Sequence, residues 1–143
     1  MSLGGFASVV NAQAPVRAGL PASSGAALKL NDAGYEHAVQ LIAQGHVVLD
    51  KRDEWGVHRP TGAAQGAFID QHGYGEYGGW FLGVNDAFDV DTRRRYEFPY
   101  GDFEVVRRSA LLAARYRARQ WGHAEVEAAA ERLLSLMAAR APA

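Results

Sequence analysis

The sequence contains no cysteine, which excludes disulfide bonds and thiolate metal sites. Only two lysines are present, Lys29 and Lys51, so the positive charge is carried mainly by arginine. No apolar run approaches the roughly 18 residues that a membrane-spanning helix needs. The N-terminus also lacks the basic and then apolar pattern of a signal peptide. These absences lead us to expect a cytoplasmic protein with no membrane partner.

Length and composition favour one domain. The chain has 143 residues and a net charge of −1, so its overall charge does not point to nucleic acid. Residues 1–28 are rich in alanine, glycine, proline and serine and show no periodicity, which predicts a flexible or extended N-terminal arm. Residues 29–143 are then expected to form a single α+β domain.

Helices and short strands alternate in the first half of that domain. Asn31 is a suitable N-cap for a helix that ends near Gly45. The apolar run at residues 46–50, followed by a charged turn and residues 55–58, predicts a β-hairpin. A second helix is expected from about 62 to 71, closed by Gly73, and residues 80–84 are expected to be extended.

The second half is expected to be mainly helical. Residues 96–99 predict a short strand, and Asp102 is a suitable N-cap for a long helix over residues 103–121. Gly122 then separates that helix from a last one over 124–140, so the two form an antiparallel helical hairpin. The apolar face of the last helix is predicted to consist of Val126, Ala129, Ala130, Leu133 and Met137. The fold class is therefore α+β, mostly helical, with a few short strands.

Aromatic residues are concentrated in the middle of the chain. Eleven of the fifteen aromatic residues fall between Trp55 and Phe103. They supply the large side chains that an alanine-rich protein needs for its core, and an exposed cluster of them would instead line a ligand pocket. Both interpretations stay open from the sequence. The candidates for a pocket are Trp55, His58, Trp80, Tyr100 and Asp102.

Residues 73–78 match G-x-G-x-x-G, the pattern of a dinucleotide-binding loop. That motif requires a strand before it and a helix after it. Here the preceding residues are predicted helical and the following ones extended, so the match does not indicate dinucleotide binding. The glycines are better explained by positive φ angles or by close packing of backbone against rings.

Three longer motifs carry a resemblance to a known family. They are W-x-x-H-x-P from Trp55, EYGxWxLG at 76–83 and YxFPYGDF at 96–103. Together with RAxQ at 117–120 and EAA at 127–129, they resemble a family of small uncharacterised bacterial proteins. The resemblance covers residues 31–140 and implies no activity, because none is established for that family.

Charge is distributed unevenly along the chain. Residues 50–91 carry a net charge of −5, whereas residues 93–119 carry +5. One interpretation is pairing between the two blocks, within one chain or between subunits. The other is an arginine stripe that binds nucleic acid or another anion. The candidates for that role are Arg93, Arg94, Arg95, Arg108, Arg115 and Arg119.

The sequence offers little chemistry that requires a metal or cofactor. None of the five histidines has the spacing of a familiar metal motif, and only His58 and His72 are considered as metal ligands. We expect no cofactor. The favoured hypothesis is a non-catalytic binding or interaction module that self-associates as a homodimer. The alternatives are a small metal-assisted hydrolase, which would use His58, His72 and a carboxylate, or a weak nucleic-acid or anion binder.

Overall fold

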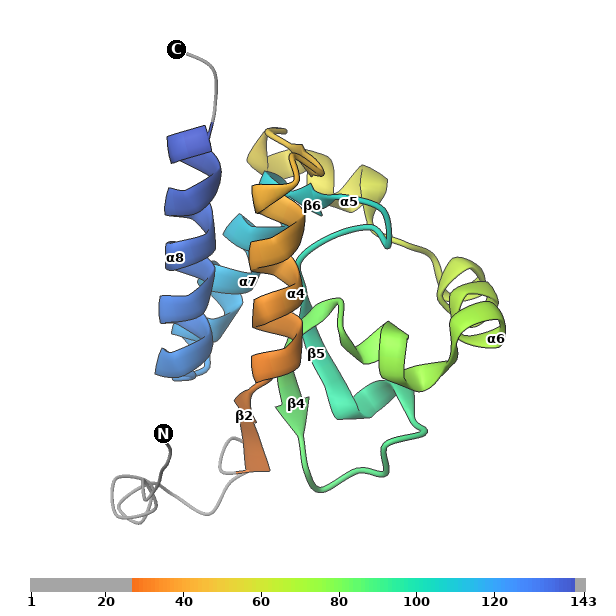
Figure 1. The fold of residues 1–143 in the computed structure, drawn as a ribbon. Coiled ribbons are helices and arrows are strands. Elements are labelled where there is room, and N and C mark those ends of the chain that lie inside the picture. The colour runs from red at the N-terminus through yellow and green to blue at the C-terminus, as the bar shows by residue number, and fades with distance from the viewer. Residues whose placement is uncertain (1–26, 141–143) are drawn as a thin grey trace, which may run out of the picture.

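The computed structural model describes residues 27–140, which form helices around a small antiparallel sheet (Figure 1). The strands are β2 (Leu28–Leu30), β3 (Val47–Val48), β4 (Phe81–Asn85), β5 (Tyr96–Pro99) and β6 (Val106–Arg107). The α-helices are α4 (Asp32–Ala43), α5 (Trp55–His58), α6 (Gly62–Gly78), α7 (Arg108–Gln120) and α8 (Ala124–Arg140). Two 3-10 turns, η1 (Arg52–Glu54) and η2 (Arg93–Arg95), precede α5 and β5.

The sheet has the strand order β2-β4-β5, and both pairs of strands are antiparallel. The central strand, β4, is buried along its whole length, so it brings apolar residues to both faces of the sheet. A separate two-stranded sheet joins β3 to β6 in parallel, with Val47 opposite Val106. This parallel pairing links the chain after α4 to the start of α7.

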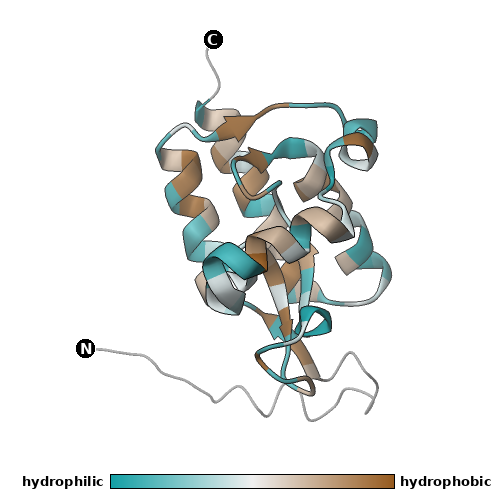
Figure 2. Ribbon diagram, turned by 90° about the vertical axis from the view of Figure 1, so that its right-hand side faces the viewer, coloured by the Kyte–Doolittle hydropathy of each residue, from teal (hydrophilic) through white to brown (hydrophobic). Residues whose placement is uncertain are grey.

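The helices occupy two regions around the sheet. Helices α4, α7 and α8 pack together and against the strands, whereas α6 lies on the opposite side of the molecule from α8 (Figure 1). Brown, hydrophobic residues dominate the strands and alternate with teal, hydrophilic ones along the helices (Figure 2). The core contains Leu82 of β4, Leu111 of α7 and Leu133 of α8, each with no exposed surface. Alanine at buried positions such as Ala130 allows the helices to approach closely.

Several predictions from the sequence are confirmed. The fold is α+β and mostly helical, with small sheets of short strands. Helices α7 and α8 form the predicted hairpin, joined at Gly122, whose φ of 78° is left-handed. Residues 81–85 and 96–99 are strands. The apolar face predicted for the last helix is buried in full.

The predicted hairpin over residues 46–58 is wrong. Val47 and Val48 do form a strand, but it pairs with β6, far along the chain, rather than with residues 55–58. Those later residues form the short helix α5, and Trp55 is buried there. The β-branched pair therefore predicts a strand correctly, while its partner is chosen by the tertiary fold.

The predicted helix start after Asp102 is also wrong, because α7 begins at Arg108. Residues 102–105 form a tight turn that brings Gly101 beside Val106 in an isolated bridge. The second predicted helix continues beyond its expected end: α6 runs to Gly78, with a kink at Gly73, where φ is 83° and ψ is 168°. The G-x-G-x-x-G sequence thus lies within a kinked helix, with no strand directly before it.

Two further predictions concern the N-terminus and the membrane. The predicted N-terminal arm, residues 1–28, lies outside the described residues except for its last two, and Leu28 belongs to β2. Within residues 27–140, no helix combines the length and the apolar character that a membrane crossing requires.

Candidate functional site

A cavity of about 490 Å³ opens between the segment before α6, strand β5 and helix α7. Its walls are largely apolar and include Trp55, Phe81 and Phe98, with Ala110 and Ala114 of α7. A cavity of this size is within the range typical of sites for small molecules. We call it the arginine-rimmed pocket.

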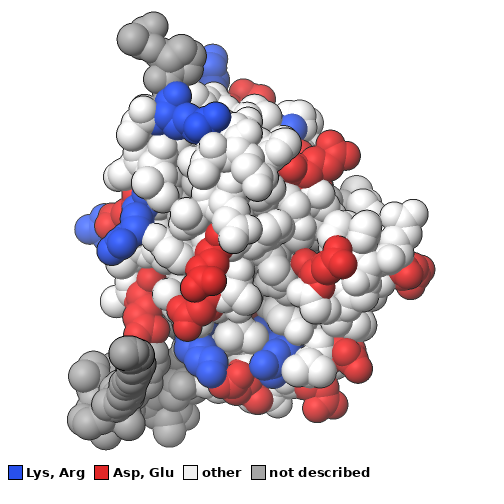
Figure 3. Space-filling model, in the orientation of Figure 1, with Lys and Arg blue, Asp and Glu red and all other residues white. Residues whose placement is uncertain are grey.

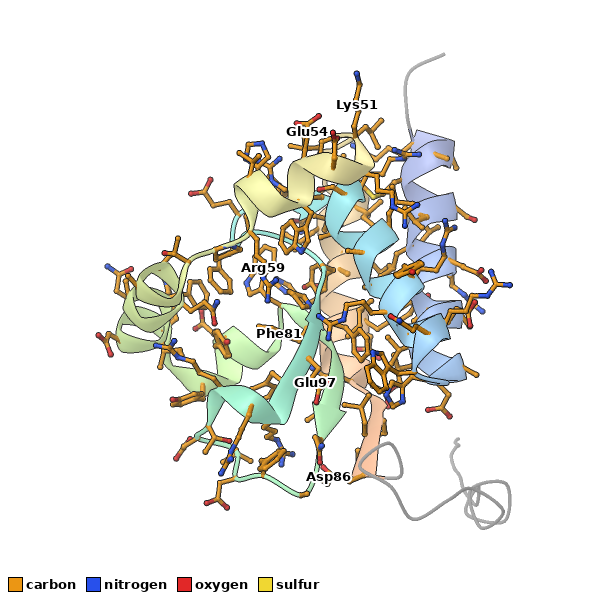
Figure 4. All side chains as sticks on the ribbon, turned by 180° about the vertical axis from the view of Figure 1, so that it is seen from behind. Lys51, Glu54, Arg59, Phe81, Asp86 and Glu97 are labelled. Carbon is orange, nitrogen blue, oxygen red and sulfur yellow. The ribbon has the colours of Figure 1, made fainter. Side chains whose placement is uncertain are left out.

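Four arginines from three separate segments line this pocket. Arg59 precedes α6, Arg93 and Arg94 belong to η2, and Arg117 belongs to α7. The pocket has a single acidic residue in its lining, Glu97 of β5. Figure 4 views the molecule from behind and shows Arg59, Phe81 and Glu97 on the side where α6 faces β5. The pocket therefore combines apolar walls with an excess of positive charge.

The four guanidinium groups differ in the contacts that they already make within the protein. Within residues 27–140, those of Arg59 and Arg117 have no hydrogen-bond or ion-pair partner. Arg93 donates one bond of 3.2 Å to the Gly62 carbonyl. Arg94 lies over the Phe88 ring, 4.5 Å from its centroid. All four of these arginines are exposed, so their charges remain available to an anion.

The segment 97–103 forms the floor of the pocket and has an unusual backbone. Phe98 and Phe103, with φ of 64° and 73°, are the two non-glycine residues of positive φ in the described part of the chain. Each such conformation costs about 1–3 kcal/mol and is most often retained at functional sites. Gly101 lies between them, where a Cβ would overlap the Val105 carbonyl and come within 2.8 Å of Trp80.

A buried carboxylate fixes the start of α7, which forms one wall of the pocket. Asp50 is 6% exposed and accepts bonds from the Ser109 backbone N–H at 2.8 Å and the Ser109 hydroxyl at 2.8 Å. Arg107 adds a third bond, at 3.0 Å. Burial alone would raise the pKa of Asp50, but these bonds outweigh burial, and its pKa lies below the usual value.

Asp102 does not cap a helix. Its Oδ1 accepts from the backbone N–H groups of Glu104 and Val105 at 3.0 and 2.9 Å, which closes the turn over residues 102–105. Its Oδ2 accepts from Arg107 Nε at 2.8 Å. Burial alone would raise the pKa of Asp102. The hydrogen bonds from Val105, Arg107 and Glu104 outweigh burial, so its pKa lies below the usual value. Arg107 thus joins Asp102 to Asp50.

The other pocket candidates are placed differently. Trp55 lines the arginine-rimmed pocket. Tyr100 is fully buried, and Trp80 is 6% exposed beside a second cavity. His58 is exposed on α5, with Nε2 at 3.7 Å from Glu54. The five residues therefore do not share one pocket.

The arginine candidates are also divided by the fold. Arg93 and Arg94 line the pocket, whereas Arg95 binds the Phe88 carbonyl and Asp86. The three on α7 lie outside its lining: Arg108 donates to the Asp50 carbonyl, Arg119 lies 3.9 Å from Glu127, and Arg115 is half-buried.

The two metal candidates sit on different helices, each beside its own glutamate. His58 on α5 is 3.7 Å from Glu54 at the end of η1, and His72 lies 3.2 Å from Glu76 on α6. Across residues 27–140, no group of three or more histidine, aspartate and glutamate side chains is arranged to hold a metal ion.

Sequence reasoning missed three of the residues that matter most. Arg59 stands inside the W-x-x-H-x-P motif, and Arg117 begins the RAxQ motif, but nothing local relates one to the other. Asp50 ends the strand-like run at 46–50, and its partner Ser109 is 59 positions away. A polar residue at the end of an apolar run was the one available signal for Asp50.

Comparisons with protein-family models, with curated proteins and with solved structures found no match to this chain.

Proposed function

We propose that the protein is a binding module for a small organic anion, with an apolar body and one acidic group such as a carboxylate or phosphate. The observation that carries the proposal is the convergence of Arg59, Arg93, Arg94 and Arg117 on an apolar cavity. The apolar body would bury against the aromatic and alanine walls, and the acidic group would meet the guanidinium groups at the rim.

Two features of the pocket support this function over general anion binding. The strained segment 97–103 supplies part of its lining, and strain of this kind is most often kept where it serves a site. Apolar walls would also add nothing to the binding of a bare phosphate backbone. On the face shown in Figure 3, basic and acidic side chains lie side by side and form no continuous basic surface.

A direct test uses 2-naphthoate as the anionic probe and 2-naphthamide as its neutral counterpart. Titration followed by NMR is expected to show saturable shifts at the Trp55 indole and at β5 with the carboxylate, and much weaker binding of the amide. Ala113→Phe places a ring in the cavity and is expected to abolish binding of 2-naphthoate.

Charge variants separate the rim from the rest of the surface. Arg59→Gln and Arg117→Gln are each expected to weaken binding about two- to fivefold, the range for exposed ion pairs. Arg119→Gln, on the same helix as Arg117 but outside the pocket, is the matched control and should leave binding unchanged. Equal binding of the amide, or an equal loss in Arg119→Gln, would refute the proposal.

A further inference from the structure

A second cavity of about 490 Å³ lies between α4, α6 and the start of β4, and Phe103 lines both cavities. Its other principal lining residues are His37, Phe68, His72, Glu76 and Trp80. We call it the histidine pocket. Its chemistry differs from that of the arginine-rimmed pocket, because its lining contains no lysine or arginine.

The hydrogen bonds beneath this pocket determine the tautomer of His37. The Tyr100 hydroxyl lies 2.6 Å from the Gly79 carbonyl oxygen and 2.8 Å from His37 Nδ1. A carbonyl oxygen can only accept, so the single hydroxyl proton of Tyr100 goes to Gly79. His37 Nδ1 must then carry a proton and donate it to Tyr100. In the neutral ring, the lone pair is consequently on Nε2.

His72 lies beside a carboxylate. Its Nδ1 is 3.2 Å from Glu76 Oε1, an ion-pair contact between two side chains on the same helix. In the neutral imidazole one ring nitrogen is an acceptor. The pocket therefore offers acceptor atoms from His37, His72 and Glu76, each exposed or half-buried and able to meet a ligand.

Aromatic rings and local charge add to this acceptor set. Phe68 and Phe103 are stacked, with centroids 4.4 Å apart, and Trp80 stands at 88° to Phe103. Ring faces attract cations. The sequence between Arg59 and Arg93 contains no lysine or arginine. On the face shown in Figure 3, acidic side chains without basic ones are seen toward the α6 side, whereas Arg93 lies at the N-terminal end of α6, 3.2 Å from the Gly62 carbonyl.

We propose that the histidine pocket binds an organic cation, a guanidinium or primary ammonium group on a short apolar chain. The cationic group donates to Glu76 and to His37 Nε2, and the chain packs on Phe68 and Phe103. A guanidinium suits the site because it is planar and donates in several directions at once. Binding here does not depend on the arginine-rimmed pocket, so the two proposals can fail separately.

The test is an NMR titration with n-butylguanidinium chloride, at constant ionic strength, against neutral n-butylurea. The expected result is saturable shifts of the Trp80 indole and of the His37 and His72 rings with n-butylguanidinium alone. Glu76→Gln should weaken binding about two- to fivefold. Asp70→Asn removes the same charge from the exposed side of α6 outside the pocket and should leave binding unchanged.

Three outcomes would overturn the proposal. They are equal binding of n-butylurea, equal weakening by the two charge variants, and the absence of saturable shifts at the pocket residues. Glu76 and Asp70 are both exposed, so neither substitution should prevent folding. A circular dichroism spectrum matching that of the wild type confirms that each variant is folded.

Discussion

Replacing Asp50 by asparagine should destabilise the protein by about 3 kcal/mol, although the two side chains have the same shape. The amide places an N–H₂ group where the carboxylate now accepts from Arg107 or Ser109, so donors face donors. Hydrogen bonds to charged groups contribute about 1.5–3 kcal/mol each, and losing a partner of a buried ion pair costs about 3–5 kcal/mol. Arg107 retains its 2.8 Å bond to Asp102, which puts the cost at the lower end.

Urea unfolding followed by tryptophan fluorescence measures this cost. Against a typical total stability of about 5–15 kcal/mol, a loss of 3 kcal/mol moves the midpoint far to lower urea while the slope stays the same. Asp53→Asn, an exposed acid in η1, is the matched control and should change the free energy of unfolding by less than about 0.5 kcal/mol. A loss below about 1 kcal/mol in Asp50→Asn, or an equal loss in Asp53→Asn, would refute this reasoning.

The same carboxylate makes a prediction about acid. Because the pKa of Asp50 in the fold lies below its ordinary value of 3.8, its contribution is present above the unfolded pKa. That contribution is lost as the pH falls through the folded pKa. The difference in unfolding free energy between wild type and Asp50→Asn should therefore be largest near pH 7 and shrink below about pH 4. A difference that stays constant down to pH 2 would contradict the assignment.

Two further substitutions test the packing at the end of α6 and the buried hydroxyl of Tyr100. Gly78→Ala should cost about 1–3 kcal/mol by urea unfolding, because the new Cβ overlaps the Tyr96 ring, whereas Gly75→Ala, with open space at its Cβ on the same helix, should be neutral or stabilising. Tyr100→Phe removes a fully buried hydroxyl and should cost about 1–3 kcal/mol. In wild type, the imidazole ¹⁵N shifts of His37 should show a protonated Nδ1; a protonated Nε2 in the neutral ring would contradict the hydrogen-bond assignment.

The features that could be predicted from the sequence depend on residues close together in the chain. The face of α8 follows from apolar residues at helical spacing, and the helical hairpin follows from Gly122 between two such patterns. Asn31 was predicted to cap α4, and it does precede that helix. Its side chain, however, donates to the Gly78 and Phe81 carbonyls at 2.9 and 3.0 Å and makes no capping bond. The position of Asn31 before α4 was therefore predictable from the sequence, and its hydrogen-bond partners were not.

The failures share one physical cause, which is that distant segments compete with local ones for the same polar groups. Asp102 is followed by a helix within a few residues, so capping is the natural local prediction. Asp102 does bond the backbone N–H groups two and three residues later, but those bonds close a turn rather than begin a helix. Its second oxygen binds Arg107, which also binds Asp50, 57 positions earlier in the sequence. The pocket shows the same limit: Arg93 and Arg94 stood out as a basic run, but Arg59 and Arg117 join them only in the folded chain.

The hydrogen bonds and ion pairs that join Asp50, Ser109, Arg107 and Asp102 form a network, which we call the Asp50 network. This network explains how an alanine-rich protein keeps the walls of a cavity in place. Ser109 ties Asp50 to the first turn of α7, which supplies Ala110 to the arginine-rimmed pocket, and Arg107 ties it to Asp102, whose turn contains Phe103. Small side chains alone cannot fix a wall, because they fill little space and restrict their neighbours weakly. The buried ion pairs supply that restriction instead. A loosened network should therefore weaken binding of 2-naphthoate in Asp50→Asn even where the variant remains folded, although Asp50 does not line the pocket.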